Sequence, residues 1–146
     1  MILSGADINQ YILYGGLNFS PSLRPEQFQQ NGIDLFLAEA KPIRVGVDIT
    51  FYLGRTLETV TMPNDLMGDV ALRSTFARGF ILMPNTKVDA GFQGTITLEI
   101  WAWNDVVLPI GQRFVHFVLH KLASPSAPYR GKYQGQVGIT PGILDK

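Results

Sequence analysis

Short apolar segments separated by frequent turn residues constrain this chain more than any other feature of its sequence. Fifteen glycines and nine prolines are spread along 146 residues. Glycine allows the backbone conformations that tight turns need, and proline interrupts helices and central strands. A chain interrupted this often builds its core from many short strands instead of long helices.

The apolar residues from residue 33 onward mostly follow the two-residue period of strands. The clearest alternation covers residues 44–53 and predicts one half-buried strand. Further strands are expected at 33–37, 57–62, 70–73, 79–83, 92–103 and 114–122. Many short strands joined by turns predict a mostly β fold, a barrel or a jelly-roll-like sandwich.

The N-terminal segment is expected to be helical. Ser4 can cap a short helix from Ala6 to Tyr14, with Asp7 in the first turn. Gly15-Gly16 ends this helix. Its expected apolar stripe consists of Ile8, Ile12 and Leu13. Residues 18–30 are rich in proline, serine and glutamine and are expected to form a loop.

The C-terminal segment, residues 123–146, is rich in glycine and proline and has little periodicity. Such a segment is either mobile or lies on another surface. The whole chain has the size of one domain, so we expect a single domain over residues 1–146 with 123–146 as a tail.

Composition excludes several classes of function. The formal net charge is zero, which does not support a general attraction to nucleic acid or to an anionic membrane. Without cysteine the chain has no disulfide, no thiol nucleophile and no thiolate metal site. His116 and His120 lie four residues apart on an expected strand, where ordinary strand histidines are favoured over metal ligands. Residues 1–20 have no signal-peptide pattern and no segment approaches the length of a membrane span, so we expect a cytoplasmic protein.

Glu99 is the first candidate catalytic residue. Alternation along 94–100 places the isoleucines and Leu98 on one face, and Thr95, Thr97 and Glu99 on the other. A carboxylate that points away from the core, among hydroxyl and indole groups, suits a general base or acid. An ordinary solvent-facing glutamate fits the same position, so the strand alone leaves both interpretations open.

The segment Arg73-Ser74-Thr75-Phe76-Ala77-Arg78 is a candidate anion-binding element. Arginine pairs bidentately with phosphate oxygens, and the two hydroxyl groups can hold a phosphate or a water. Surface salt bridges would also explain both arginines.

Two further segments carry polar groups suited to a ligand. Asp89-Ala90-Gly91-Phe92-Gln93-Gly94 brings two glycines around an aromatic ring, so its backbone can approach a ligand closely, although a hairpin turn fits equally well. In the tail, Tyr129, Lys132 and Gln136 offer an aromatic ring, a cation and an amide, which a disordered polar end would also contain.

Taken together, these elements resemble the dCTP deaminase branch of the dUTPase-like superfamily. The motifs follow one another over nearly the whole chain: Met1–Ser4 with the helix after it, Asn31–Leu35, RSTFAR at 73–78, DAGFQG at 89–94, TLE at 97–99, the Gly111-Gln112 turn and PYRGKYQGQ at 128–136. Several ordered motifs in one chain are far more specific than any one of them.

The resemblance implies a distorted jelly roll of the β-clip type that assembles as a homotrimer, with active sites between subunits. It implies metal-free attack of water on C4 of the cytosine in dCTP, giving dUTP and ammonia. Magnesium would arrive with the triphosphate, and zinc is not expected because the chain has no Pro-Cys-x-x-Cys ligand set. The sequence leaves inhibition by dTTP open.

Residue roles follow from the same resemblance. Glu99 would be the general base, Ser74 would position the water, and Arg78 would support the site electrostatically. The remaining expected substrate-binding residues are Arg73, Thr75, Phe76 and Ala77 for the triphosphate, Asp89 for the 3′-hydroxyl and Phe92 for the deoxyribose. Thr97 and Leu98 are also expected to bind substrate. Tyr129, Lys132 and Gln136 are expected to close over the base and phosphates from the tail.

The chain also departs from the family pattern. The segment between Arg78 and Asp89 is short, and Ala102 stands where the family usually has asparagine. Asp89 occupies the position from which related dUTPases activate a water that attacks phosphorus, so a dUTPase or a bifunctional enzyme is an alternative. A catalytically silent homologue that binds a nucleotide or a partner protein is a further one. The Thr97-Leu98-Glu99 sequence favours deamination.

Overall fold

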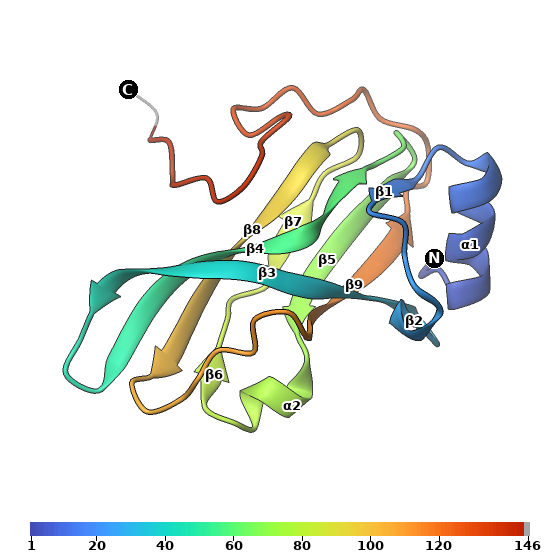
Figure 1. Cartoon of the computed structure of the whole chain (residues 1–146). Helices are drawn as coiled ribbons and strands as arrows, with labels where there is room; N and C mark the ends of the chain where they lie inside the picture. The colour runs from blue at the N-terminus through green and yellow to red at the C-terminus, as the bar shows by residue number, and fades with distance from the viewer. Residues whose placement is uncertain (145–146) are drawn as a thin grey trace.

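The computed structural model of this chain describes residues 1–144 and consists mainly of antiparallel strands (Figure 1). The helices are α1 (Gly5–Tyr14), the 3₁₀ turn η1 (Pro25–Gln27) and α2 (Ser74–Ala77). The strands are β1 (Asn18–Ser20), β2 (Phe28–Gln29), β3 (Gly32–Val45), β4 (Ile49–Thr61), β5 (Leu66–Leu72), β6 (Ile81–Leu82), β7 (Thr86–Val88), β8 (Gln93–Trp103) and β9 (Arg113–Lys121). The prediction of a mostly β chain is confirmed.

The strands form one curled sheet in the order β6-β8-β4-β3-β9-β5-β7. β3 is long enough to belong to both halves of it: residues 33–36 pair with β9, and residues 37–45 pair with β4. The pairing register of β3 shifts at Leu35/Phe36 and again between Leu37 and Glu39. A strand bends at such irregularities, so β3 carries the sheet from one layer into the other, as a jelly-roll-like fold requires.

The core fills the space between the two layers. Its fully buried side chains come mainly from α1, β3, β4, β5, β8 and β9, and include Ile8, Ile33, Leu35, Val60, Leu66, Leu98, Ile100, Phe114 and Phe117. Phe117 meets Phe19 of β1 edge to face, with ring centroids 6.3 Å apart. Each of these side chains contributes about 1.5–3 kcal/mol by leaving water, so the fold depends chiefly on this core.

A buried carboxylate holds the bend in β3. Glu58 of β4 is 2% exposed, and its Oε1 accepts a hydrogen bond of 2.9 Å from the backbone N–H of Phe36. The amide of Gln27 donates to Glu58 Oε2 at 3.2 Å and to the carbonyl of Asp34 at 2.9 Å. These bonds satisfy backbone groups that the register shift removes from the strand ladder.

The N-terminal helix is confirmed, with one error in its predicted apolar stripe. Ser4 and Asp7 form a reciprocal capping box, and the helix ends at Gly15. Ile8 is fully buried, but Leu13 is 58% exposed. Leu13 lies roughly 140° around the helix from Ile8, because each residue turns the chain by about 100°, so the two side chains cannot share one face.

The prediction of a single strand over residues 44–53 is wrong. The backbone N–H of Gly46 donates to the carbonyl of Ile49 and closes a hairpin between β3 and β4, so Val47 lies in the turn and is exposed. In β4 the buried side chains are at even positions such as Thr50 and Glu58, whereas Phe51 and Leu53 face the other way. A two-residue period defines two faces of a strand but does not say which one meets the core.

Smaller differences concern the loops. Residues 18–30, predicted to form a loop, contain β1, η1 and β2. The short strand β7 lies in a segment where the sequence predicts no strand. The turn at Gly111 is confirmed and has a φ of 82°, a conformation that favours glycine. The tail from residue 123 crosses the outside of the sheet near β8 (Figure 1). Within residues 1–144, no helix combines the length and apolar character needed to cross a membrane.

We expect Glu58 to make stability depend on pH. Burial raises the pKa of Glu58, against the opposing effect of its hydrogen bonds from Phe36 and Gln27. The folded protein therefore binds this proton more tightly than the unfolded chain, and stability falls as the pH rises through the folded pKa. Thermal unfolding from about pH 4 to pH 8 should show a smaller loss of stability with rising pH for Glu58→Gln than for the wild type.

The matched control is Glu26→Gln, at an exposed glutamate of the neighbouring η1 turn. Its melting temperatures should follow the wild-type pH dependence. Parallel curves for Glu58→Gln and the wild type would contradict the assignment.

Candidate active site

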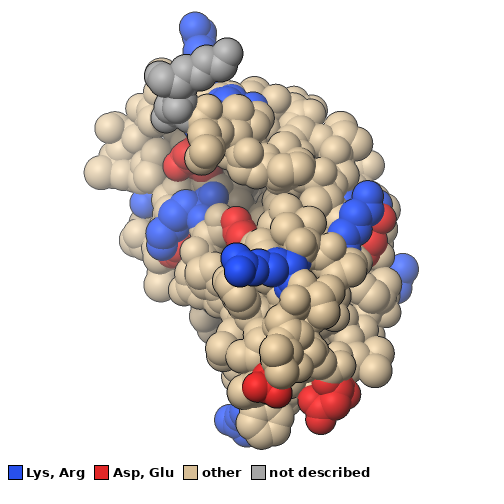
Figure 2. Space-filling view, turned by 90° about the vertical axis from the view of Figure 1, so that its left-hand side faces the viewer, with Lys and Arg blue, Asp and Glu red and all other residues tan. Residues whose placement is uncertain are grey.

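One pocket gathers six of the fourteen predicted site residues. We call it the tail pocket; its volume is about 680 Å³, and it lies between β4, β7, β8 and the tail. Its lining includes Ile43, Phe51, Leu53, Thr86, Lys87, Val88, Asp89, Phe92, Ile96, Thr97, Glu99, Tyr129, Tyr133, Gln136, Thr140, Pro141 and Gly142. Figure 2 shows the side of the molecule that carries the β3–β4 hairpin, with a mostly uncharged surface and a hollow bordered by acidic and basic side chains.

Glu99 points from β8 into the tail pocket, as the alternation predicts. Leu98 and Ile100 on either side of it are fully buried in the core, and Glu99 itself is partly exposed. Across the sheet, Glu99 is paired with Leu53 of β4. The carboxylate therefore sits on a long strand paired with β4, beside an apolar wall and open to a ligand-sized space.

The tail forms the outer wall of this pocket and is bonded to the start of β8. The backbone N–H of Thr95 donates to the carbonyl of Gln136 at 3.0 Å, and the amide of Gln136 donates to the carbonyl of Thr95 at 2.7 Å. Thr140 donates its backbone N–H to Thr97 Oγ1 at 3.2 Å. The tail thus lies directly over the strand that carries Glu99.

The two glycines of the 89–94 segment allow this close approach. A Cβ atom at Gly91 would lie 2.6 Å from Cα of Pro128, and one at Gly94 would lie 2.7 Å from the carbonyl oxygen of Gln136. Between them, the Phe92 ring meets the Tyr129 ring edge to face at 5.7 Å. The sequence predicts that backbone here can be approached closely, and the approaching group is the chain's own tail.

Arg73, Ser74 and Thr75 line a different pocket. We call it the helix pocket; its volume is about 390 Å³. Its other lining residues are Gln29, Gln30, Asn31, Asp34, Ala71, Leu72 and His116. Arg73 precedes α2, and its guanidinium lies 3.3 Å from the carboxylate of Asp34. This pocket has the positive charge and the hydroxyl groups of the predicted anion site, but not Glu99.

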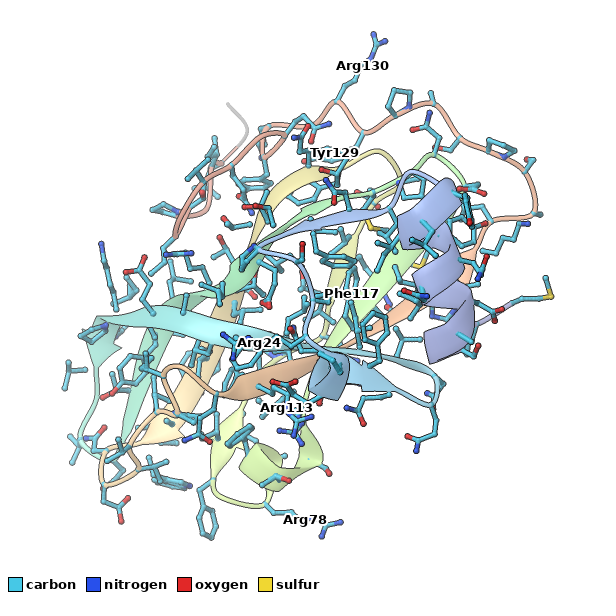
Figure 3. All side chains as sticks on the ribbon, turned by 45° about the vertical axis from the view of Figure 1, so that its right-hand side comes forward. Arg24, Arg78, Arg113, Phe117, Tyr129 and Arg130 are labelled. Atoms are coloured by element: carbon cyan, nitrogen blue, oxygen red, sulfur yellow. The ribbon has the colours of Figure 1, made fainter. Side chains whose placement is uncertain are left out.

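Five predicted site residues line neither pocket. Phe76 packs on Phe114 with ring centroids 5.3 Å apart, and Ala77 is exposed. Leu98 is buried in the core, and the Lys132 ammonium lies 5.9 Å from the centre of the Tyr133 ring. Arg78 is exposed and extends from the end of α2 into solvent (Figure 3).

A single chain therefore separates the predicted groups into two sets. Figure 3 shows Arg78 and Tyr129 at opposite ends of the molecule. The set on β8 and the tail shares the tail pocket, and the set around α2 lies at the helix pocket. Ser74 and Arg78 do not meet Glu99 within one chain.

Sequence reasoning missed the apolar wall of the tail pocket, formed by Ile43, Phe51 and Leu53. The signal was present, since Phe51 and Leu53 fall on one face of the alternating segment. That face is assigned to the core when the segment is taken alone. Pairing β4 with β8 places Leu53 beside Glu99 instead.

Metal ligands are not grouped in the part of the chain that is described. Among residues 1–144, no three histidine, aspartate or glutamate side chains lie close enough together to hold a metal ion. Asp34 has its carboxylate next to Arg73 and Arg113, and Asp69 is bonded to Lys87 and His120. His116 and His120 thus each have an acidic neighbour within the sheet.

Comparison with known proteins agrees with this fold. A model of the dCTP deaminase-like family matches residues 49–122. The dCTP deaminase of Hyperthermus butylicus is 41% identical, over 97% of this chain and 98% of that protein. A protein of Sulfolobus islandicus rod-shaped virus 1, named "Probable deoxyuridine 5'-triphosphate nucleotidohydrolase", is 38% identical over 96% of this chain and 97% of its own length.

Two solved structures show the same fold. The Agrobacterium tumefaciens dCTP deaminase superposes with a TM-score of 0.67 at 18% identity, covering 84% of this chain and 48% of that one, so this chain spans about half of its length. A dUTPase of Staphylococcus bacteriophage 80alpha, solved with dUpNHpp, superposes with a TM-score of 0.54 at 16% identity, covering 80% of this chain and 96% of that one.

These likenesses confirm a dUTPase-like jelly roll. The fold therefore places the protein in the dUTPase-like class. With 41% identity to a dCTP deaminase over nearly its whole length, the chain belongs to the dCTP deaminase family.

Gln134 should be a main anchor of the tail. Its side chain accepts a hydrogen bond from the backbone N–H of Gln93 at 2.8 Å and donates to the carbonyls of Gly91 and Tyr129 at 2.9 Å. Gln134→Ala should therefore loosen the tail without unfolding the sheet. Hydrogen exchange of the Gly135 amide should become roughly tenfold faster, as expected for the loss of about one hydrogen bond's net free energy.

Gln112→Ala, at an exposed turn residue beside β9, is the control and should leave exchange in the tail unchanged. Equal protection of Gly135 in Gln134→Ala and the wild type would show that other contacts hold the tail.

Proposed function

We propose that the protein is a dCTP deaminase. Water adds to C4 of the cytosine in dCTP, the C4–N bond breaks, and the products are dUTP and ammonia. The observation that carries the proposal is the position of Glu99 on β8, inside a pocket that also contains Asp89, Phe92 and Gln136. Membership of the dCTP deaminase family supports the same reaction.

In this proposal Glu99 is the general base. It takes a proton from the attacking water and delivers it to the departing amino group, a role that typically contributes ~10²–10⁴-fold to the rate. Ser74 holds the attacking water, and Arg78 supports the site electrostatically. The central position of Glu99 in β8 favours this role, because a rigid strand fixes the carboxylate relative to the base.

Nucleotide binding is divided between the two pockets. At the helix pocket, Arg73 and the segment Thr75–Ala77 contact the triphosphate. At the tail pocket, Asp89 binds the 3′-hydroxyl and Phe92 packs against the deoxyribose, while Thr97 and Leu98 contribute backbone beside the base. The tail residues Tyr129, Lys132 and Gln136 close over the nucleotide. We further propose that the tail, 123–146, is this closing element; its last two residues lie outside the described part of the chain.

The separation of the two pockets supports a homotrimer. A complete site needs the α2 segment of one subunit beside the tail pocket of its neighbour. The outward face of the sheet next to the tail pocket is apolar, with Leu82 61% exposed, Trp101 44% and Trp103 40%. Phe51 stacks on Trp101, with ring centroids 4.6 Å apart. A second subunit packed on this face would remove apolar surface from water.

Magnesium enters the proposed reaction bound to the triphosphate. Phosphate oxygens are ligands that Mg²⁺ prefers, and such sites usually involve few protein groups. The described residues fit this arrangement, because their acidic side chains are not clustered. We place the activity in the cytoplasm.

Hydrolysis of dUTP to dUMP and pyrophosphate is the second candidate, alone or together with deamination. Asp89 lies in the tail pocket, where it could activate a water for attack on phosphorus. The viral relative supports this candidate, because it is named as a probable deoxyuridine 5'-triphosphate nucleotidohydrolase and is 38% identical over 96% of this chain.

Products formed from dCTP and dUTP in the presence of magnesium separate the candidates. We expect dUTP and ammonia from dCTP, and Glu99→Gln should reduce this rate by about 10²–10⁴-fold while nucleotide binding is retained. Formation of dUMP and pyrophosphate, lost in Asp89→Asn, would establish the hydrolase instead or in addition. Turnover of neither nucleotide would refute both enzymatic proposals and leave the catalytically silent homologue.

Subunit mixing tests the shared site. Ser74→Ala and Glu99→Gln should each be inactive alone, but refolding the two together should restore about a quarter of the sites (one half times one half), because a cyclic trimer pairs one pocket of each subunit with the other pocket of its neighbour. If each chain carried a whole site, the mixture would stay inactive. A monomeric mass in solution would also count against the arrangement.

A further inference from the structure

A buried carboxylate lies in the wall of the helix pocket. The side chain of Asp34 is 3% exposed, and three cationic or titratable groups surround it. Arg73 Nε and Arg113 Nη1 each lie 3.3 Å from Asp34 Oδ2, and His116 Nδ1 lies 3.1 Å from Asp34 Oδ1. A carboxylate this deeply buried is costly unless it is paired, so these partners explain how Asp34 is tolerated.

Strand pairing brings the cluster together. Asp34 of β3, His116 of β9 and Ala71 of β5 are register partners across three neighbouring strands. Arg73 follows the end of β5, and Arg113 begins β9. A Cβ atom at Gly32 would lie 2.8 Å from the His116 ring, so a glycine at this position leaves room for it.

Arg73 is held on more than one side. Its Nη1 donates to the carbonyl of Arg113 at 2.9 Å, and its backbone N–H donates to the carbonyl of Phe114 at 3.0 Å. Its guanidinium also lies 6.0 Å from the centre of the Phe76 ring. The side chain is still 29% exposed and lines the helix pocket. These contacts therefore fix the direction of the Arg73 side chain while leaving part of it accessible to a ligand in the helix pocket.

The charges of the cluster do not cancel. Two guanidinium groups, which stay charged at any ordinary pH, face one carboxylate. The two guanidinium groups therefore leave the cluster with an excess of positive charge. Since Arg73 lines the helix pocket beside Ser74 and Thr75, this excess is open to an anionic group there.

We propose that Asp34 is a positioning residue for nucleotide binding: it holds Arg73 in the direction from which its guanidinium receives the phosphates. The inference rests on the proposed nucleotide reaction but adds a residue that does not itself touch the substrate. Fixing a charged fork in advance lowers the ordering cost of binding.

The two possible roles of Asp34, orienting Arg73 or acting only through its negative charge, predict opposite effects of Asp34→Asn on nucleotide binding. Asp34→Asn keeps the shape of the side chain but removes a negative charge near the phosphate site. If Asp34 acted only through its charge, nucleotide binding would become tighter. If Asp34 orients Arg73, binding becomes weaker, and KM for the nucleotide that the wild type turns over should rise roughly tenfold, the size expected for one lost charge-assisted hydrogen bond. The value of kcat should change little.

A double-mutant cycle tests whether the effect passes through Arg73. In an Arg73→Ala background, Asp34→Asn should cause no further rise in KM. Asp34→Glu is a second variant in case Asp34→Asn fails to fold. It keeps the charge but moves the carboxylate by one methylene. If Asp34 orients Arg73, KM should rise; if Asp34 acts only through its charge, KM should keep the wild-type value.

Asp65→Asn is the control variant. It weakens the 2.8 Å hydrogen bond from the Tyr11 hydroxyl, away from both pockets, and should lower the melting temperature without changing KM. An unchanged or lower KM in Asp34→Asn, or an equal rise in the Arg73→Ala background, would overturn the role of Asp34 while the proposed reaction stands. If the wild type turns over neither nucleotide, calorimetric dissociation constants for dCTP and dUTP replace KM, and absence of binding overturns both proposals.

Discussion

The bend in β3 is the constraint on which the rest of the structure depends. One strand can belong to both layers only if the backbone groups at its bend, which lose their hydrogen bonds to the neighbouring strands, find other partners. The Glu58 carboxylate and the Gln27 amide supply the missing bonds at Phe36 and Asp34. Because the bend places β4 and β8 in one layer and β5 and β9 in the other, it also sets where the two pockets lie.

The same strand links fold and site through two buried carboxylates. Glu58 bonds to the backbone of β3 and closes the bend, while Asp34, two residues before Phe36, faces Arg73 at the helix pocket. The side-chain amide of Gln27 donates one hydrogen bond to the Glu58 carboxylate and another to the backbone carbonyl of Asp34. Both acids are stabilised by hydrogen bonds or by cationic partners, as buried charges require. One carboxylate holds the architecture, and the other orients the proposed phosphate contact.

The tail pocket depends on a strand with two different faces. The inward face of β8 belongs to the core, and its outward face presents Thr95, Thr97 and Glu99 to the tail. Gly91 and Gly94 let the tail pass close enough to be bonded there. The tail pocket thus contains the predicted groups of β8 and the tail, but Ser74 lies in the helix pocket and Arg78 lines neither pocket. This incomplete set of groups is the structural reason to expect a second subunit at each site.

The sequence by itself determined the mostly β class, the capped N-terminal helix, the outward direction of Glu99 and the family motifs. These features depend on local spacing, turn residues and capping, which can be read without knowing what packs against them. Tertiary structure alone decided that Phe51 and Leu53 face a pocket instead of the core and that the tail lies on β8. It also divided the predicted residues between two pockets. Each of these outcomes depends on contacts between distant segments, and strand periodicity defines two faces without naming the partner of either.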